Sequence, residues 1–149
     1  MSSSAPILMA YDFSEPAERA LAWAGTLAQL ERSPLVLLHV KVDPFTKVAL
    51  PADSSLWAKP EVWPRQQQAL RNALQQVAAI ILGPAPPFPL ALRVERGVVG
   101  PSILAARAAL GATLIVLGTT GKGGIARALM GSVSQHVLHG APCPVLLVP

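Results

Sequence analysis

Cysteine is nearly absent from the sequence, and this excludes the class of small proteins that depend on disulfides. The 149 residues include one cysteine, Cys143, so an intramolecular disulfide cannot form. Disulfide frameworks are typical of small secreted domains. A domain of this length buries roughly 70% of its unfolded surface and needs no covalent staple. The composition therefore predicts a single domain over residues 1–149 in a reducing compartment.

Long apolar runs are also missing, although the chain is apolar on average. Hydrophobic residues make up 52% of the chain and charged residues 13%. No window reaches the roughly 18 continuous apolar residues of a membrane span. The N-terminal stretch has no Lys or Arg before its short apolar run, as a secretory signal would. These absences predict a cytoplasmic protein that does not associate with membranes.

Acidic residues are absent from the C-terminal part of the chain. Glu95 is the last carboxylate, and residues 96–149 carry basic residues only, within a chain of formal net charge +4. An acid-free segment favours an anionic ligand. Nucleic acid is not expected as that ligand, because the basic residues do not form a run and aromatic residues make up only 5% of the chain.

Apolar runs and helical periodicity alternate along the chain. Five short runs are near-continuously apolar, which is typical of strands buried on both faces of a parallel sheet. Patterns of helical period separate them, with Ser14 as the expected N-cap of the first helix and Ser132 of the last. The order predicts an open α/β sheet with right-handed crossovers. The strands are expected at 6–11, 34–40, 89–94, 112–117 and 144–148, and the helices at 14–32, 61–82, 101–110 and 132–139.

A glycine-rich stretch, GTTGKGGIARALMGS at 118–132, follows the fourth apolar run. It does not fit the Walker A pattern, because Lys122 is followed by glycine instead of Ser or Thr and Val116 stands where the first glycine belongs. A dinucleotide pattern, G-x-G-x-x-[GA], starts at Gly121. Its ribose-binding acid should follow about 20 residues later, and none is present.

A third interpretation uses the whole glycine-rich stretch. Gly118 and Gly121 would let the backbone approach a phosphate closely. Gly131 and Ser132 would offer free N–H groups and a hydroxyl at the N-terminus of the last helix, the positive end of its dipole. Lys122 or Arg127 would add positive charge. The stretch is then a phosphate-binding loop.

The spacing G-x2-G-x9-G-[ST] resembles the nucleotide-binding signature of the universal stress protein family. The opening PILMAYDFSEPAERAL and the close GSVSQHVLHGAPCPVLLVP are also similar to that family. The resemblance implies a Rossmann-like fold of the adenine nucleotide alpha hydrolase type, an open five-stranded parallel sheet of order 3-2-1-4-5 with helices on both faces. In that order the first and fourth strands are neighbours, and Asp12 and Gly118 meet in the crevice at their carboxyl ends.

The resemblance also implies a ligand and its contacts. ATP would bind with Mg²⁺ or Mn²⁺, the metal held through the phosphates, with Asp12 near both. Val40 would contact adenine through its backbone. A second interpretation of Asp12 is that it helps to cap the helix starting near Ser14, and Phe13 stands where the family often has glycine. The implied contact residues are Ala10, Tyr11, Asp12, Val40, Leu117, Gly118, Gly121, Lys122, Gly131, Ser132, Val133 and Ser134.

No nucleophile–base pair is visible, and hydrolysis of a phosphoanhydride would need a positioned water, a base and a carboxylate-held metal. No catalytic residue is therefore predicted. The sequence favours an ATP-binding regulatory or sensor protein of the stress response, with at most slow hydrolysis. The resemblance implies a homodimer through the C-terminal strand 144–148. Two alternatives remain open, a nucleotide hydrolase on the same fold and a protein-interaction module that binds no nucleotide.

Overall fold

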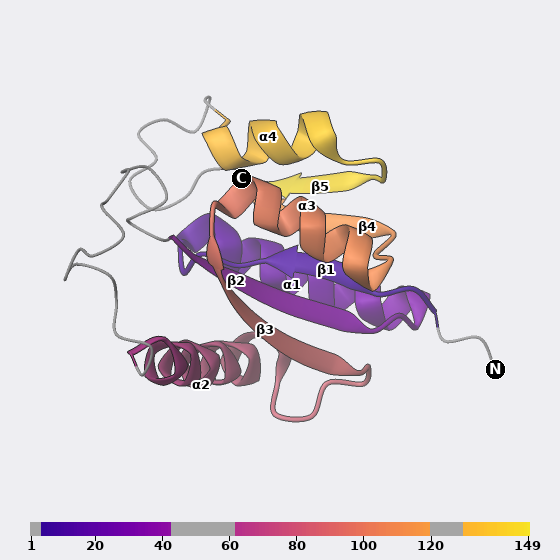
Figure 1. Cartoon of the computed structure of the whole chain (residues 1–149). Helices are drawn as coiled ribbons and strands as arrows, with labels where there is room; N and C mark the ends of the chain where they lie inside the picture. The colour runs from indigo at the N-terminus through magenta and orange to yellow at the C-terminus, as the bar shows by residue number, and fades with distance from the viewer. Residues whose placement is uncertain (1–3, 43–61, 120–129) are drawn as a thin grey trace.

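The computed structural model describes residues 4–42, 62–119 and 130–149 (Figure 1). Strands and helices alternate as predicted, and their ends differ from the predicted ends by only a few residues. The elements are β1 (Ile7–Ala10), α1 (Glu15–Glu31), β2 (Leu35–Val42), α2 (Val62–Leu82), β3 (Leu90–Gly97), α3 (Val99–Leu110), β4 (Leu114–Gly118), α4 (Ser132–Gly140) and β5 (Val145–Val148).

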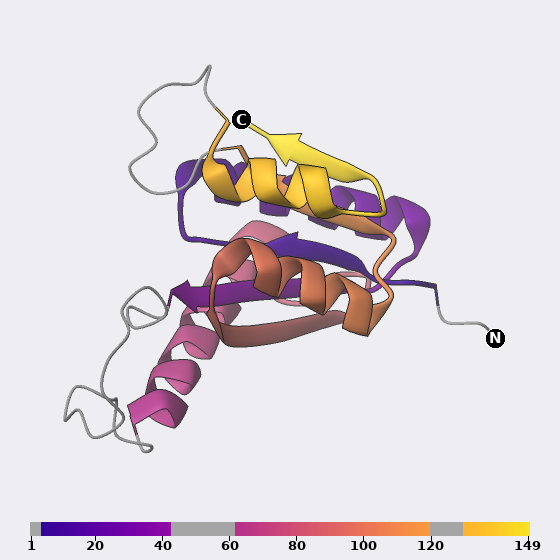
Figure 2. The ribbon, with the colours of Figure 1, turned by 45° about the horizontal axis from the view of Figure 1, so that its top comes forward.

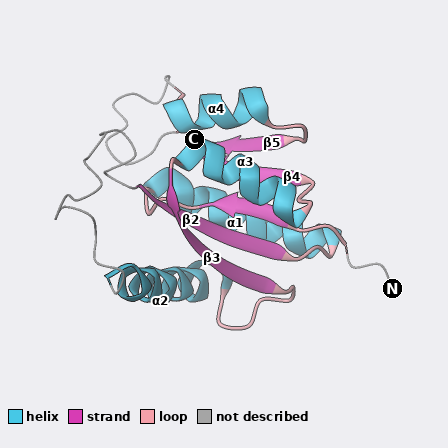
Figure 3. Cartoon of the chain, in the orientation of Figure 1, coloured by secondary structure: helices cyan, strands magenta, loops and turns pink. Residues whose placement is uncertain are grey.

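The five strands form one parallel sheet in the order β3-β2-β1-β4-β5, which confirms the predicted topology (Figure 3). Ile7 of β1 lies opposite Leu35 of β2 and Leu114 of β4. Helices α1 and α2 cover one face of the sheet, and α3 and α4 cover the other (Figure 2). This arrangement buries both faces, which explains why the strand sequences are apolar at successive positions.

The core consists of two layers, one on each side of the sheet. Ile7 and Met9 point toward α1 and α2, whereas Leu8 between them points toward α3 and α4. All three side chains are fully buried. The alternation follows from the two-residue period of a strand. The central strand β1 is therefore held rigidly from both faces, and so is the chain segment that leaves its carboxyl end.

The helices that follow β1 and β4 begin in different ways. Ser14 is the N-cap of α1, as predicted, and its hydroxyl accepts a hydrogen bond from the Ala17 amide. The predicted cap of α4 is wrong by one residue, because Gly131 is the N-cap and Ser132 is the first helical residue. The amide of Gly131 is bonded to the carbonyl of Thr119, and this bond holds Gly131 in an extended conformation outside the helix.

No helix within the described ranges is both long enough and apolar enough to cross a bilayer.

Candidate functional site

The sheet has its topological switch point between β1 and β4. The helix that follows β1 lies on one face, and the helix that follows β4 lies on the other (Figure 2). The two strands pair in parallel, with Met9 opposite Val116, so their carboxyl ends lie at the same edge. Open α/β sheets bind ligands in the crevice at such a point. Asp12 follows β1 and Gly118 ends β4, so these two residues lie at this edge although they are far apart in the sequence.

Gly118 lies against the first turn of α1. A Cβ atom at this position would lie 2.8 Å from Pro16 Cβ, 3.0 Å from the Pro16 carbonyl carbon and 3.1 Å from the Ala17 nitrogen. Two of these atoms belong to the backbone and the third to a proline ring, so none can move away easily. Close packing of β4 on α1 therefore requires a glycine here, in addition to any role that Gly118 has toward a ligand.

The chain is pinned on both sides of residues 120–129. The Thr119 amide donates to the Val148 carbonyl at 2.9 Å, and the Gly131 amide donates to the Thr119 carbonyl at 2.7 Å. The buried hydroxyl of Ser134 donates to the carbonyls of Gly118 at 2.9 Å and Thr119 at 3.2 Å. The expectation of a free Gly131 amide is therefore wrong, because this amide is hydrogen-bonded to the Thr119 carbonyl.

The N-terminus of α4 lies beside the end of β4, and its first amides have no partner within the helix. The first hydrogen bond of the helix runs from the Gln135 amide to the Gly131 carbonyl at 3.0 Å. The amides of Ser132, Val133 and Ser134 precede it, so they have no partner within the helix. Gly131 supplies no side-chain cap. The positive end of the helix dipole and these donors together suit an anion such as a phosphate group.

Asp12 is exposed just after β1, and its carboxylate forms hydrogen bonds within the turn that leads to α1. Its Oδ1 accepts hydrogen bonds from the amide of Ser14 at 3.0 Å and from the Ser14 hydroxyl. The same hydroxyl accepts from the Ala17 amide at 3.2 Å. The capping interpretation of Asp12 is confirmed. Contact with a ligand stays a prediction, and the exposure of the carboxylate leaves room for it.

Aromatic rings surround the turn between β1 and α1. The Phe13 ring meets those of Tyr11 and His39 edge-on, with both pairs of centroids 5.0 Å apart. Phe13 has a φ of 65°, a left-handed conformation that costs a non-glycine residue roughly 1–2 kcal/mol. Aromatic pairs contribute about 0.5–1.5 kcal/mol each, so the two ring contacts together offset this strain.

Tyr11 joins β1 to β2 through its backbone. Its amide donates to the Leu38 carbonyl at 2.8 Å, and its carbonyl accepts from Nδ1 of His39 at 2.7 Å. Because a carbonyl only accepts, His39 must carry a proton on Nδ1. Burial, with Glu18 and then Asp12 nearby, raises the pKa of the Tyr11 phenol to about 12. The phenol is therefore neutral over the physiological pH range.

The other predicted contact residues divide between the sheet edge and the part of the chain that the structure does not describe. The side chains of Val40 and Leu117 are buried on the α3 and α4 side, and Ala10 packs against the same layer. Gly121 and Lys122 lie outside the described residues, as does Arg127.

Two residues of this edge were not among the predicted contacts. His39 is half-buried in β2 and bonded to the Tyr11 carbonyl. Thr119 gave no signal at all, because its role depends on where the chain returns at residue 131. Within 4–42, 62–119 and 130–149, no three His, Cys, Asp or Glu side chains gather into a set that would hold a metal.

Comparisons with known proteins relate this chain to one family. The sequence model of the Universal stress protein family matches residues 4–149. A universal stress protein of Thermus aquaticus is 32% identical over 151 residues, covering 95% of this chain and 96% of the relative. A universal stress protein of Mycolicibacterium smegmatis is 29% identical, covering 95% of this chain and 47% of the relative. The chain thus spans about half the length of that relative.

Solved structures share the fold. Hypothetical protein MJ0577 superposes with a TM-score of 0.79 at 24% identity, covering 99% of this chain and 96% of the other. The universal stress protein of Archaeoglobus fulgidus in complex with dAMP gives a TM-score of 0.65 at 24% identity, covering 99% and 100%. Another universal stress protein was solved with cAMP, at a TM-score of 0.62 and 19% identity, covering 99% of both chains.

Proposed function

The chain belongs to the universal stress protein family, and from this premise we propose that it is an ATP-binding regulatory protein of the stress response. The observation that carries the proposal is the N-terminus of α4 at the switch point of the sheet, where the N-cap Gly131 supplies no side-chain hydrogen bond. The neighbouring N-terminus of α1 is closed by Ser14, so the phosphates are assigned to α4. The dAMP and cAMP complexes of two structural neighbours support an adenine nucleotide as the ligand.

Different residues of the candidate site would contact different parts of the nucleotide. The amides of Ser132, Val133 and Ser134 would bind phosphate oxygens, together with Gly121 of the signature and Lys122 next to it. The backbone of Val40 would contact adenine, and the carboxylate of Asp12 would face the ribose and the metal. The donor set fits Mg²⁺ or Mn²⁺ held mainly by phosphate oxygens, because Asp12 is one hard oxygen ligand and such ions usually keep several waters.

The first experiment is mass spectrometry of nucleotide released from the purified protein, followed by titration with ATP and Mg²⁺. We expect ATP to bind at one site per chain. Gly131→Glu would place a carboxylate beside the phosphates and should abolish binding. Ala109→Glu adds the same charge at an exposed position near the end of α3 and serves as the control. Absence of ATP binding in the unmodified protein would refute the proposal and leave the fold unaffected.

The hydrolase alternative is tested in the same preparation. Asp12 is the carboxylate proposed to meet the nucleotide, and a single acid makes a poor phosphoanhydride hydrolase. We therefore expect bound ATP to remain ATP over hours with Mg²⁺ or Mn²⁺. Multiple turnovers to ADP or AMP would establish the hydrolase instead.

We further propose that two copies associate through β5. This strand pairs with β4 on one side and forms the other edge of the sheet. Beside it lies an apolar groove of about 480 Å³, lined by Trp23 and Leu27 of α1, by Leu114 and by residues 144–149. The edge N–H and C=O groups of β5 can be satisfied by another strand, and a second β5 would supply one.

The dimer proposal has a matched pair of surface variants. Trp23 is 55% exposed and lines the groove, whereas Ile80 is 83% exposed on α2, a helix that does not line it. We expect Trp23→Ser to weaken the dimer in sedimentation equilibrium and Ile80→Ser to leave it unchanged. A protein that sediments as a monomer before any substitution would overturn this part of the proposal.

A further inference from the structure

The turn between β1 and α1 is held from both sides of Asp12. On one side, the Tyr11 carbonyl accepts from Nδ1 of His39 at 2.7 Å. On the other side, Phe13 is fixed at a φ of 65° with its ring against Tyr11 and His39. We propose that Phe13 and His39 are positioning residues, which aim the Asp12 carboxylate at the nucleotide without touching the nucleotide themselves. This inference rests on the proposed ATP site.

The contacts form a continuous path from β2 to the carboxylate. His39 belongs to β2 and binds the Tyr11 carbonyl, which precedes Asp12 directly. The Tyr11 amide is already tied to β2 through the Leu38 carbonyl at 2.8 Å. Both polar backbone groups of Tyr11 are thus fixed by one neighbouring strand, so Asp12 leaves the sheet from a rigid point.

The left-handed conformation of Phe13 then sets where the carboxylate lies. It reverses the chain so that Asp12 Oδ1 meets the Ser14 amide at 3.0 Å. An aromatic residue adopts this conformation rarely, and such an outlier persists where surrounding contacts enforce it. The half-buried ring between Tyr11 and His39 is that enforcing contact. Removal of the ring would free the turn to relax and the carboxylate to swing away.

The inference extends the role of Asp12 to residues that sequence patterns do not assign. A position that favours glycine is here occupied by phenylalanine, and His39 and Tyr11 provide the ring contacts that phenylalanine needs. Residues that orient a ligating group commonly change ligand affinity by about 10–100-fold when they are substituted. We expect effects near the lower end of that range, because Asp12 would be one of several contacts to the nucleotide.

The test measures ATP affinity, with Mg²⁺ present, in four variants of the full chain. Phe13→Ala removes the ring that holds the left-handed conformation, which alanine also disfavours, and it should weaken ATP binding about tenfold. Phe13→Tyr keeps the ring and should bind ATP as the unmodified protein does. His39→Asn retains a donor near the position of Nδ1, whereas His39→Phe retains a ring without the donor. Each His39 variant should lose less affinity than Phe13→Ala.

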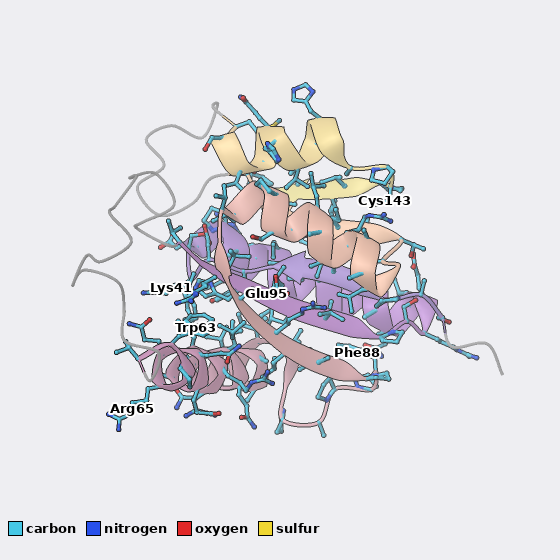
Figure 4. All side chains as sticks on the ribbon, viewed as in Figure 1. Lys41, Trp63, Arg65, Phe88, Glu95 and Cys143 are labelled. Carbon is cyan, nitrogen blue, oxygen red and sulfur yellow. The ribbon has the colours of Figure 1, made fainter. Side chains whose placement is uncertain are left out.

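Phe88→Ala is the matched control for loss of a ring. Phe88 packs against the same core layer as Phe13 but precedes β3, at the opposite end of the sheet from Lys41 (Figure 4). This variant should lose stability and retain ATP affinity. Equal losses of affinity in Phe88→Ala and Phe13→Ala would show a general structural effect and overturn the inference.

A second readout does not depend on nucleotide. The Ser14 amide is bonded to Asp12 Oδ1 at 3.0 Å, so its rate of hydrogen exchange, followed by NMR, reports whether the carboxylate stays in place. We expect this amide to exchange faster in Phe13→Ala and to stay protected in Phe13→Tyr and Phe88→Ala. An unchanged exchange rate in Phe13→Ala would overturn the inference. If the unmodified protein binds no ATP, the proposed function fails, and this measurement alone decides whether the rings position Asp12.

Discussion

At Gly118, the addition of a single methyl group should lower the stability of the fold markedly. In Gly118→Ala the new Cβ would lie 2.8 Å from the Pro16 ring and 3.0–3.1 Å from backbone atoms of Pro16 and Ala17. Ordinary van der Waals contacts of carbon atoms lie near 3.5–4.0 Å. Relief of the overlap requires either the end of β4 or the first turn of α1 to shift. Overpacking of this kind costs about 1–3 kcal/mol.

A second glycine supplies the control. In Gly25→Ala the new Cβ would lie 2.5 Å from Cδ2 of Leu82, a closer contact than any at Gly118. That atom is the end of a flexible side chain, which can rotate away. Gly25 lies inside α1, where alanine is favoured over glycine by about 1 kcal/mol. The gain in helix propensity and the cost of displacing Leu82 should nearly cancel. The change in stability therefore depends on whether the neighbouring atoms can move, and the shortest distance alone does not predict it.

The assay is guanidinium unfolding followed by far-ultraviolet circular dichroism, with a thermal scan beside it. Gly118→Ala should lower the midpoint concentration at constant slope. For a chain of this size, a loss of 1–3 kcal/mol corresponds to roughly 2–12 °C in Tm. Gly25→Ala should stay within about 1 kcal/mol of the unmodified protein. A loss of stability below about 0.5 kcal/mol for Gly118→Ala would refute the reasoning. So would a loss for Gly25→Ala that exceeds the loss for Gly118→Ala.

Three further predictions concern single groups. Ser134→Ala leaves the carbonyls of Gly118 and Thr119 without its hydroxyl and should destabilise the fold by about 1–3 kcal/mol in the same assay. Val98 is the N-cap of α3 with no side-chain cap, so Val98→Asp should stabilise by about 1 kcal/mol, and an unchanged midpoint would contradict this. The unfolded chain loses its tyrosine proton near pH 10, whereas Tyr11 in the folded protein keeps it to about pH 12. Stability should therefore fall as the pH rises across this interval, and the fall should be smaller in Tyr11→Phe.

The order of elements could be predicted from the sequence because each strand and helix carries its own periodicity. Near-continuous apolar runs such as that over 34–40 indicate strands buried on both faces, and helical spacing separates them. Ser14 could be assigned as a cap from local chemistry alone. The strand order followed from the resemblance of the glycine signature. These features depend on residues that are close in the chain, so no knowledge of packing was required.

The contacts across the candidate site depend on chain segments that are distant in sequence. Nothing near Gly118 indicates that Pro16 occupies the space of its missing side chain, because the two residues meet only when β4 packs on α1. The same holds for the Thr119 carbonyl, which takes the Gly131 amide that the sequence left free for a phosphate.

From the sequence one could predict the α/β class and, through the glycine signature, the residues of the candidate site. The tertiary structure decided which of their polar groups are available. It assigned the Gly131 amide and the Ser134 hydroxyl to the protein, left the first-turn amides of α4 without partners inside the helix, and placed His39 beside Tyr11. The physical reason is that a backbone donor or acceptor is satisfied by whichever group the fold brings within hydrogen-bonding distance, and that distance is set by the packing of whole elements.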